Sequence, residues 1–189
     1  MNIYAPLNIT GSARQYLDEQ ILNFRFPWYY YTHQINHVPR DCYRGQPLAN
    51  VPFWSHTLML PSEQEGREGI INSPYYQFFY DHFIAWLAEQ GIEPARVYRA
   101  AVNQVHHAVP GALYVMPHTD HRWPHCNWLW YLDDVPGAET VSFDLEGRIV
   151  NEWPCRKDWA LTFGGDEHTH RLPPDSQTRR VVVFTYSLN

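Results

Sequence analysis

The feature that most constrains the fold is a series of short apolar segments that begins at residue 96 and continues to the end of the printed sequence. Proline, glycine and aspartate separate the segments, which are 96–105, 112–118, 127–132, 140–145, 148–153, 159–163, 168–172 and 179–188. Short extended segments at a spacing of about ten residues are typical of antiparallel sandwiches and jelly rolls. The sequence therefore predicts a mainly β fold.

Two helices are expected before these strands. The first begins near Ser12, which is followed by Gln15 in a capping-box pattern, and the second begins near Ser73, which precedes Pro74. Their apolar faces comprise Ala13, Leu17, Ile21 and Phe24 in the first helix and Phe79, Phe83, Trp86 and Leu87 in the second. We expect both helices to pack on one face of the sheet.

Length and composition indicate one folded domain. The chain has 189 residues, of which 44% are hydrophobic and 16% aromatic, which is enough to form a substantial core. The texture changes near residue 95, so we expect residues 1–95 to form a helical and irregular support region and residues 96–189 to form the β core. The sequence leaves the oligomeric state open.

Charge and cysteine content narrow the function classes. A formal net charge of -6 argues against nucleic acid as a partner, because nucleic-acid binders usually carry a basic surface. The three cysteines, Cys42, Cys126 and Cys155, form no CxxC pair, which is typical of a reducing cytoplasm. No signal peptide and no apolar run of about 18 residues is present, so neither export nor membrane insertion is expected.

The motif His-Thr-Asp at 118–120 is a candidate for half of a metal site. In an extended segment, side chains two residues apart point the same way, so His118 and Asp120 could reach one cation. A further histidine from a distant strand would complete the facial triad of two histidines and one carboxylate that is found in Fe(II) oxygenases. The histidines at 168 and 170 are the candidates for this position.

Arg179 and Tyr131 are candidates for binding a carboxylate. Arg179 opens the last strand and shares one face with Val181, Val183 and Thr185. A guanidinium there could bind a carboxylate through two hydrogen bonds, and the hydroxyl of Tyr131 could add a third. A core tyrosine whose hydroxyl is satisfied elsewhere is an equally good interpretation of Tyr131.

The set resembles the 2-oxoglutarate/Fe(II)-dependent dioxygenase superfamily, in particular its prolyl-hydroxylase-like members and the small oxygenases of bacteria and phages. The resemblance covers residues 97–187 and rests on HTD at 118–120, WYLDD, PGAET, LTF and HRLPPDSQTR at 170–179, in that order. Gly137 and Ala138 stand where the family commonly has two glycines, so that turn matches only in part. The resemblance implies a double-stranded β-helix, a cupin-like jelly roll, supported by N-terminal helices.

The resemblance also implies a ligand set. His118, Asp120 and His170 would bind Fe(II), and Arg179 and Tyr131 would bind the distal carboxylate of 2-oxoglutarate. His168 lies two residues before His170 and would share its face, so it remains an alternative third ligand. His170 is preferred because the run that follows it, with Arg179 nine residues on, fits the family pattern.

The implied activity is oxidative decarboxylation of 2-oxoglutarate to succinate, with dioxygen as the oxidant and hydroxylation of a substrate. A peptidyl proline or a small molecule is the expected substrate.

Two other functions remain open on the sequence alone. One is oxidative demethylation of nucleobases, against which the acidic charge argues. The other is a cupin-like metal-binding protein that is not an oxygenase, which would have no need of Arg179.

Overall fold

The computed structural model describes residues 1–32, 43, 47–106, 111–174 and 176–189 of the chain. The helical elements are α1 (Gly11–Tyr16), the π-helix η1 (Leu17–Ile21) and α2 (Tyr76–Glu89). The strands are β1 (Ile3–Pro6), β2 (Tyr29–Tyr31), β3 (Leu48–Ala49), β4 (Phe53–Leu60), β5 (Ile70–Ile71), β6 (Pro94–His106), β7 (Tyr114–Val115), β8 (Cys126–Tyr131), β9 (Thr140–Phe143), β10 (Ile149–Trp153), β11 (Trp159–Gly164), β12 (His168–His170) and β13 (Thr178–Leu188).

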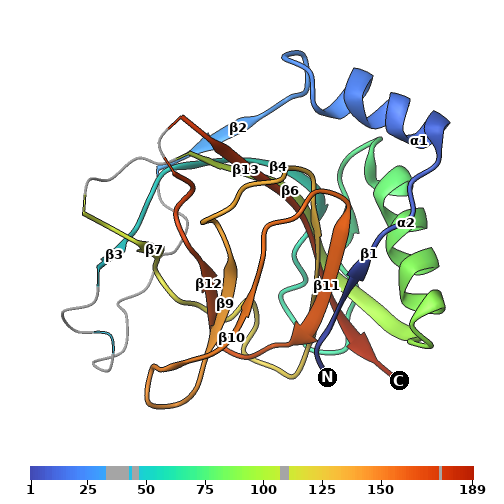
Figure 1. The fold of residues 1–189 in the computed structure, drawn as a ribbon. Helices are drawn as coiled ribbons and strands as arrows, with labels where there is room; N and C mark the ends of the chain where they lie inside the picture. Colours follow the sequence, from blue (N-terminus) through green and yellow to red (C-terminus); the bar gives the residue numbers. More distant parts are fainter. Residues whose placement is uncertain (33–42, 44–46, 107–110, 175) are drawn as a thin grey trace.

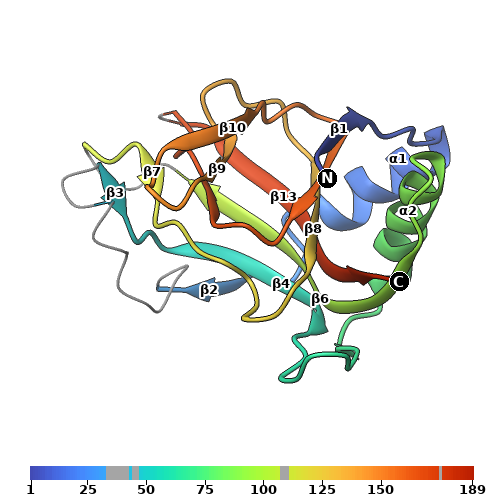
Figure 2. The same ribbon diagram turned by 90° about the horizontal axis from the view of Figure 1, so that it is seen from below.

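The strands form two facing sheets and a small parallel pair. The larger sheet has eight strands in the order β1-β11-β8-β13-β6-β4-β2, with β5 paired to β4, and the smaller has the order β10-β9-β12. Figures 1 and 2 show the smaller sheet on one side of the larger sheet and both helices on the other. The predicted mainly β fold with flanking helices is confirmed, and each of the eight predicted segments contains a strand.

The first half of the chain does more than supply helices. Strands β1, β2, β4 and β5 come from it, and they form both ends of the larger sheet. The long strand β6 pairs with β4 on one side and with β13 on the other, so it joins this region to the strands that follow. The larger sheet is therefore built from both halves of the sequence.

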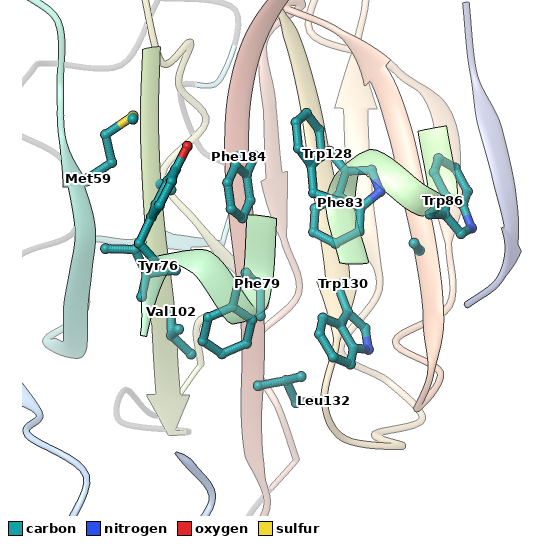
Figure 3. Packing of buried hydrophobic residues seen from close by; sticks show 14 of the residues in the cluster. Met59, Tyr76, Phe79, Phe83, Trp86, Val102, Trp128, Trp130, Leu132 and Phe184 are labelled. Carbon is teal, nitrogen blue, oxygen red and sulfur yellow. The ribbon is translucent and has the colours of Figure 1, made fainter. Parts of the chain in front are cut away.

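Side-chain alternation gives the larger sheet two different faces. On its outer face, Phe79 and Phe83 of α2 pack against Trp128, Trp130 and Phe184 of the sheet (Figure 3). The predicted apolar side of the second helix is thus confirmed, because its four residues are all buried. Burial of these large rings fixes the sheet against α2 and leaves its inner face for other residues.

The first helical segment differs from the prediction at both ends. Its N-cap is Thr10, whose Oγ1 accepts a hydrogen bond from the backbone N–H of Ala13 at 3.2 Å, rather than Ser12. The helix changes to a π-helix at residues 17–21, where Leu17 and Ile21 are buried as predicted. Phe24 lies beyond the end of the helix and is 90% exposed, so its assignment to the apolar face was wrong. The wider π-turn ends the helix before Phe24 can join that face.

The expectations about membrane insertion and about the cysteines can be compared with the described residues only. No helix of the described residues is long and apolar enough to cross a bilayer. Cys126 and Cys155 are free thiols, and Cys42 lies outside the described residues.

Candidate metal centre and carboxylate pocket

Backbone pairing places His118 beside His168. His118 lies just after β7, outside any named strand, and forms an isolated antiparallel bridge with the first residue of β12. The N–H of each residue donates to the C=O of the other at 2.9 Å. Because paired residues in an antiparallel bridge project to the same side, the two imidazole rings come to 4.7 Å between centroids.

Asp120 completes a compact cluster with these two histidines. Its Oδ2 lies 3.5 Å from Nε2 of His168, and its side chain is only 4% exposed. One potential ligand atom from each of His118, Asp120 and His168 lies within 4.8 Å of the others. The structure therefore brings the two ends of the HTD motif together with one histidine from β12.

Hydrogen bonds to backbone carbonyls orient both histidine rings. Nδ1 of His168 lies 2.9 Å from the carbonyl oxygen of Asp166, and Nδ1 of His118 lies 3.4 Å from that of Met116. A carbonyl oxygen can only accept, so the network assigns the proton to Nδ1 in each ring. This leaves Nε2 with a free lone pair, which is the arrangement that metal-binding histidines use.

Burial and charge set the protonation of the cluster. Burial, with a contribution from the charge of His168, lowers the pKa of His118 to about 4, so its ring is neutral near pH 7. Burial alone would raise the pKa of Asp120, but the charges of His168 and Arg99 more than offset this and hold that pKa well below its usual range. Two imidazoles and one carboxylate suit a divalent transition-metal ion.

His170 lies in the same cavity but outside this cluster. It is two residues further along β12, and successive same-face residues on a strand are about 6.6 Å apart. Its Nδ1 lies 2.9 Å from the carbonyl oxygen of Arg171. Burial, followed by the charge of Arg179, lowers the pKa of His170 well below its usual value. The bridge to His118 therefore aligns His168, not the sequence-preferred His170, with the HTD motif.

A cavity of about 250 Å³ opens between the two sheets beside the cluster. This is just below the usual range for small-molecule sites, which is about 300–1,000 Å³. Its walls carry the three clustered residues and His170, together with Arg99, Asn103, Thr140 and Arg179 among the polar side chains. Val181 and Val183 line it as well, so the face that they share with Arg179 points into the cavity.

Arg179 is a buried cation in the wall of this cavity. It is 3% exposed, its Nε donates to the carbonyl oxygen of Ala138 at 3.2 Å, and its Nη2 donates to Oγ1 of Thr140 at 2.9 Å. No carboxylate of the described residues forms an ion pair with it. A buried guanidinium without a counter-ion is costly, so the site is suited to an anionic ligand.

Tyr131 acts on this region through Thr140. Its hydroxyl donates to Oγ1 of Thr140 at 2.8 Å, and its ring centroid lies 5.6 Å from the guanidinium carbon of Arg179. Oγ1 of Thr140 therefore accepts from both Tyr131 and Arg179, which leaves the threonine hydroxyl proton for a third partner. Sequence reasoning did not assign a role to Thr140, although it lies in the PGAET segment that carried part of the family resemblance.

Arg99 is the other functional candidate that sequence reasoning missed. It projects from β6 into the cavity, and its Nη1 donates to Oδ1 of Asp120 at 2.7 Å. In the sequence, alternation places it on one face with Ala101 and Asn103, but nothing distinguishes it there from the other polar residues of the same strand. The pairing of β6 with β13 that places it there joins residues about 80 positions apart and is not readable from local patterns.

Comparisons with known proteins give a fold but little sequence similarity. No protein-family model matches the chain. A 55-residue segment is 33% identical to isoleucine–tRNA ligase of Lactococcus lactis subsp. lactis, but it covers 29% of this chain and 6% of that enzyme. So short a match supports no argument about this chain's fold or activity.

Solved structures match over nearly the whole chain. A 2OG-Fe(II) oxygenase family oxidoreductase from Burkholderia pseudomallei aligns with a TM-score of 0.69 and 13% identity, over 98% of this chain and 84% of that one. A prolyl hydroxylase from Trichoplax adhaerens, solved with a hypoxia inducible factor peptide fragment, aligns with a TM-score of 0.59 and 14% identity, over 98% and 83%. The viral collagen prolyl hydroxylase of Paramecium Bursaria Chlorella virus-1 aligns with a TM-score of 0.54 and 12% identity, over 99% and 96%. The chain thus shares the fold of these oxygenases, as the sequence resemblance predicted.

Proposed function

We propose that this protein is an Fe(II)- and 2-oxoglutarate-dependent oxygenase. The observation that carries the proposal is the presence, in one cavity, of two sites that this chemistry needs. One is a cluster of two histidines and a carboxylate, and the other is a buried arginine without a carboxylate partner among the described residues. The shared fold of the structural neighbours supports the same conclusion.

His118, Asp120 and His168 are the proposed ligands of Fe(II). The donor set is that of the facial triad, which leaves three positions of an octahedral ion open. The bound iron would supply the oxidising chemistry in which dioxygen converts 2-oxoglutarate to succinate and hydroxylates the substrate. The protein's own residues hold the ion, orient the two imidazoles through backbone carbonyls and keep the site within a small cavity.

Arg179 and Thr140 are the proposed partners of the distal carboxylate of 2-oxoglutarate. The arginine hydrogen bonds to described residues use Nε and Nη2, which leaves Nη1 for a ligand. The hydroxyl proton of Thr140 can be donated to the same carboxylate, because its oxygen already accepts two hydrogen bonds. Tyr131 then has a supporting role, in which it orients Thr140, rather than the direct contact that the sequence suggested.

For the substrate we propose a small molecule or a peptide, with a peptidyl proline as the first candidate. The Trichoplax neighbour was solved with a peptide fragment, which supports the peptide class. The net charge of -6 argues against a nucleic acid. A cytoplasmic location remains a prediction from the cysteine content.

The test separates the metal site from its alternatives. Under anaerobic conditions, wild-type protein with Fe(II) and 2-oxoglutarate should show a weak visible charge-transfer band. Mn(II) affinity measured without 2-oxoglutarate should fall in His168→Ala and be retained in His170→Ala. The opposite result would assign the third ligand to His170. If the wild type shows no band and no 2-oxoglutarate turnover to succinate, the oxygenase proposal is wrong.

A further inference from the structure

Arg99 is the cavity residue whose contacts the proposed function does not yet explain. It lies on the inner face of β6, where its register partner on β13 is Thr185. Its Nη1 donates to Oδ1 of Asp120 at 2.7 Å, which makes a charge-assisted hydrogen bond at the short end of the usual range. The arginine side chain is 29% exposed whereas the aspartate is 4% exposed, and both line the cavity.

The two oxygens of Asp120 have different neighbours. Oδ1 accepts from Arg99, while Oδ2 lies 3.5 Å from Nε2 of His168, on the side of the metal cluster. A carboxylate that binds an ion through both oxygens takes two coordination positions, and one that binds through a single oxygen takes one. The proposed reaction needs three open positions, because 2-oxoglutarate binds through two atoms and dioxygen needs another.

We propose that Arg99 is a positioning residue that holds Oδ1 of Asp120 and so presents Oδ2 alone to the metal ion. This inference rests on the proposed function, because it assumes that His118, Asp120 and His168 bind the ion. It assigns to Arg99 the orientation of the carboxylate and the preservation of the third open position. Partners of metal-bound carboxylates contribute in this way to affinity as well as to geometry.

A simpler role for Arg99 predicts an opposite effect on metal affinity. A guanidinium beside the site repels a divalent cation, so if Arg99 acted only as a nearby charge, its removal would tighten metal binding. If Arg99 orients the carboxylate, its removal should weaken metal binding, because Asp120 is then no longer held in place and must be ordered when the ion binds. The sign of the change in metal affinity therefore distinguishes the two roles.

The first measurement is the Mn(II) affinity of purified variants without 2-oxoglutarate. Arg99→Met, which keeps much of the side-chain length and removes every donor, should weaken Mn(II) binding by about 10- to 100-fold. Arg99→Lys keeps the charge and one flexible donor group, so it should restore part of this loss. Affinity in Arg99→Met equal to or higher than that of the wild type would overturn the proposal.

The second measurement counts the water molecules on Mn(II) in the presence of 2-oxoglutarate, from the line broadening of the Mn(II) spectrum in ¹⁷O-labelled water. The wild-type complex should keep an exchangeable water at the third open position. In Arg99→Met the carboxylate can bind through both oxygens, so fewer waters should remain. The same count in both proteins would contradict the one-oxygen geometry.

Arg180 provides a matched control. It follows Arg179 and leaves β13 on the opposite face, where its Nη2 and Nε bind Asp133 at 2.6 and 2.9 Å. Arg180→Met breaks a comparable Arg–Asp pair and should lower thermal stability while leaving Mn(II) affinity unchanged. If Arg180→Met weakens Mn(II) binding as much as Arg99→Met, general destabilisation explains both results and the proposal fails.

His118→Ala separates failure of this inference from failure of the proposed function. If His118→Ala leaves Mn(II) affinity unchanged, the metal site itself is wrong. If His118→Ala abolishes binding and Arg99→Met has no effect, the metal site stands and only the role of Arg99 is lost. Arg99→Lys is the variant to use should Arg99→Met not fold.

Discussion

The two faces of the eight-stranded sheet have opposite chemistry although they come from the same strands. On β13, Val182, Phe184 and Tyr186 belong to the apolar core that packs against α2. The residues that alternate with them, from Arg179 to Val183, line the cavity. Because successive side chains of β13 point to opposite faces, this strand contributes to the apolar core on one side and to the cavity on the other.

The difference between the two faces shows where the fold accommodates buried charged groups. The outer face consists of large rings in mutual contact, which contribute to stability by burial alone (Figure 3). The inner face buries Arg179 without a carboxylate partner among the described residues and keeps Asp120 ionised beside Arg99. A buried guanidinium without a counter-ion lowers stability unless a ligand binds it, so apolar burial on the outer face offsets the cost of Arg179.

The largest effect we expect comes from the outer face. Phe83 is fully buried, stacks on Phe184 at 4.7 Å between ring centroids and contacts Trp128 edge-on at 5.4 Å. Phe83→Ala should lower the free energy of unfolding by about 3–5 kcal/mol, measured by urea denaturation. Mn(II) affinity of the folded protein should not change.

Phe24→Ala is the control for this experiment, because Phe24 is 90% exposed and its removal should alter stability by no more than about 0.5 kcal/mol. A large loss in this variant, or a parallel loss of Mn(II) affinity in Phe83→Ala, would mean that the two faces are not independent.

Much of the outer face could be predicted from the sequence, because its signals are local. The helical spacing of Phe79, Phe83, Trp86 and Leu87 identified the buried side of α2. Phe24 was assigned wrongly because a π-turn is not visible in a hydrophobic pattern.

The inner face could be predicted only in part, because its geometry depends on pairing between distant segments. The HTD motif and Arg179 were found from local patterns. The choice between His168 and His170 depends on the bridge to His118, and the contact of Arg99 with Asp120 depends on how β6 enters the sheet. Side chains two apart on a strand have the same orientation, so their pattern alone cannot select one.

The second-largest effect that we expect comes from Arg179, the buried cation of the inner face. Arg179→Lys keeps the charge but loses the planar group that can bind a carboxylate through two hydrogen bonds. We expect the apparent affinity for 2-oxoglutarate to fall by about 2–3 kcal/mol, or roughly 30- to 150-fold, while Mn(II) affinity without 2-oxoglutarate is retained. Titration of the visible band of the Fe(II) complex measures this change. An unaltered 2-oxoglutarate requirement would remove Arg179 from the proposed role.

A smaller effect should follow from Tyr131→Phe. The hydroxyl of Tyr131 donates to Thr140, which in turn accepts from Arg179, so its loss removes one buried hydrogen bond and leaves the arginine in place. We expect about 1 kcal/mol lower stability and a several-fold weaker 2-oxoglutarate affinity. If Tyr131→Phe weakens 2-oxoglutarate binding as much as Arg179→Lys does, the tyrosine contacts the ligand directly.

The smallest effect we expect is a pH dependence of the outer face, at its one buried histidine on β4. Nε2 of His56 lies 2.7 Å from Oγ of Ser73, and its Nδ1 lies 2.9 Å from the carbonyl oxygen of Pro27. Burial lowers the pKa of His56 below 6.5, with the Pro27 carbonyl partly opposing this. The unfolded chain therefore binds a proton more readily than the folded one, so stability is fully present above pH 6.5 and decreases as the pH falls below it.

Urea denaturation of the metal-free protein between pH 7.5 and about 5.5 should show this loss of stability, and His56→Gln should reduce the slope because its amide does not titrate in this range. An identical slope in His56→Gln would place the titrating groups elsewhere, among the histidines of the inner face. Saturating Mn(II) would not remove the contribution of its ligands, because the unfolded chain still gains protons at those histidines, so the comparison of wild type with His56→Gln in the metal-free protein is what isolates His56.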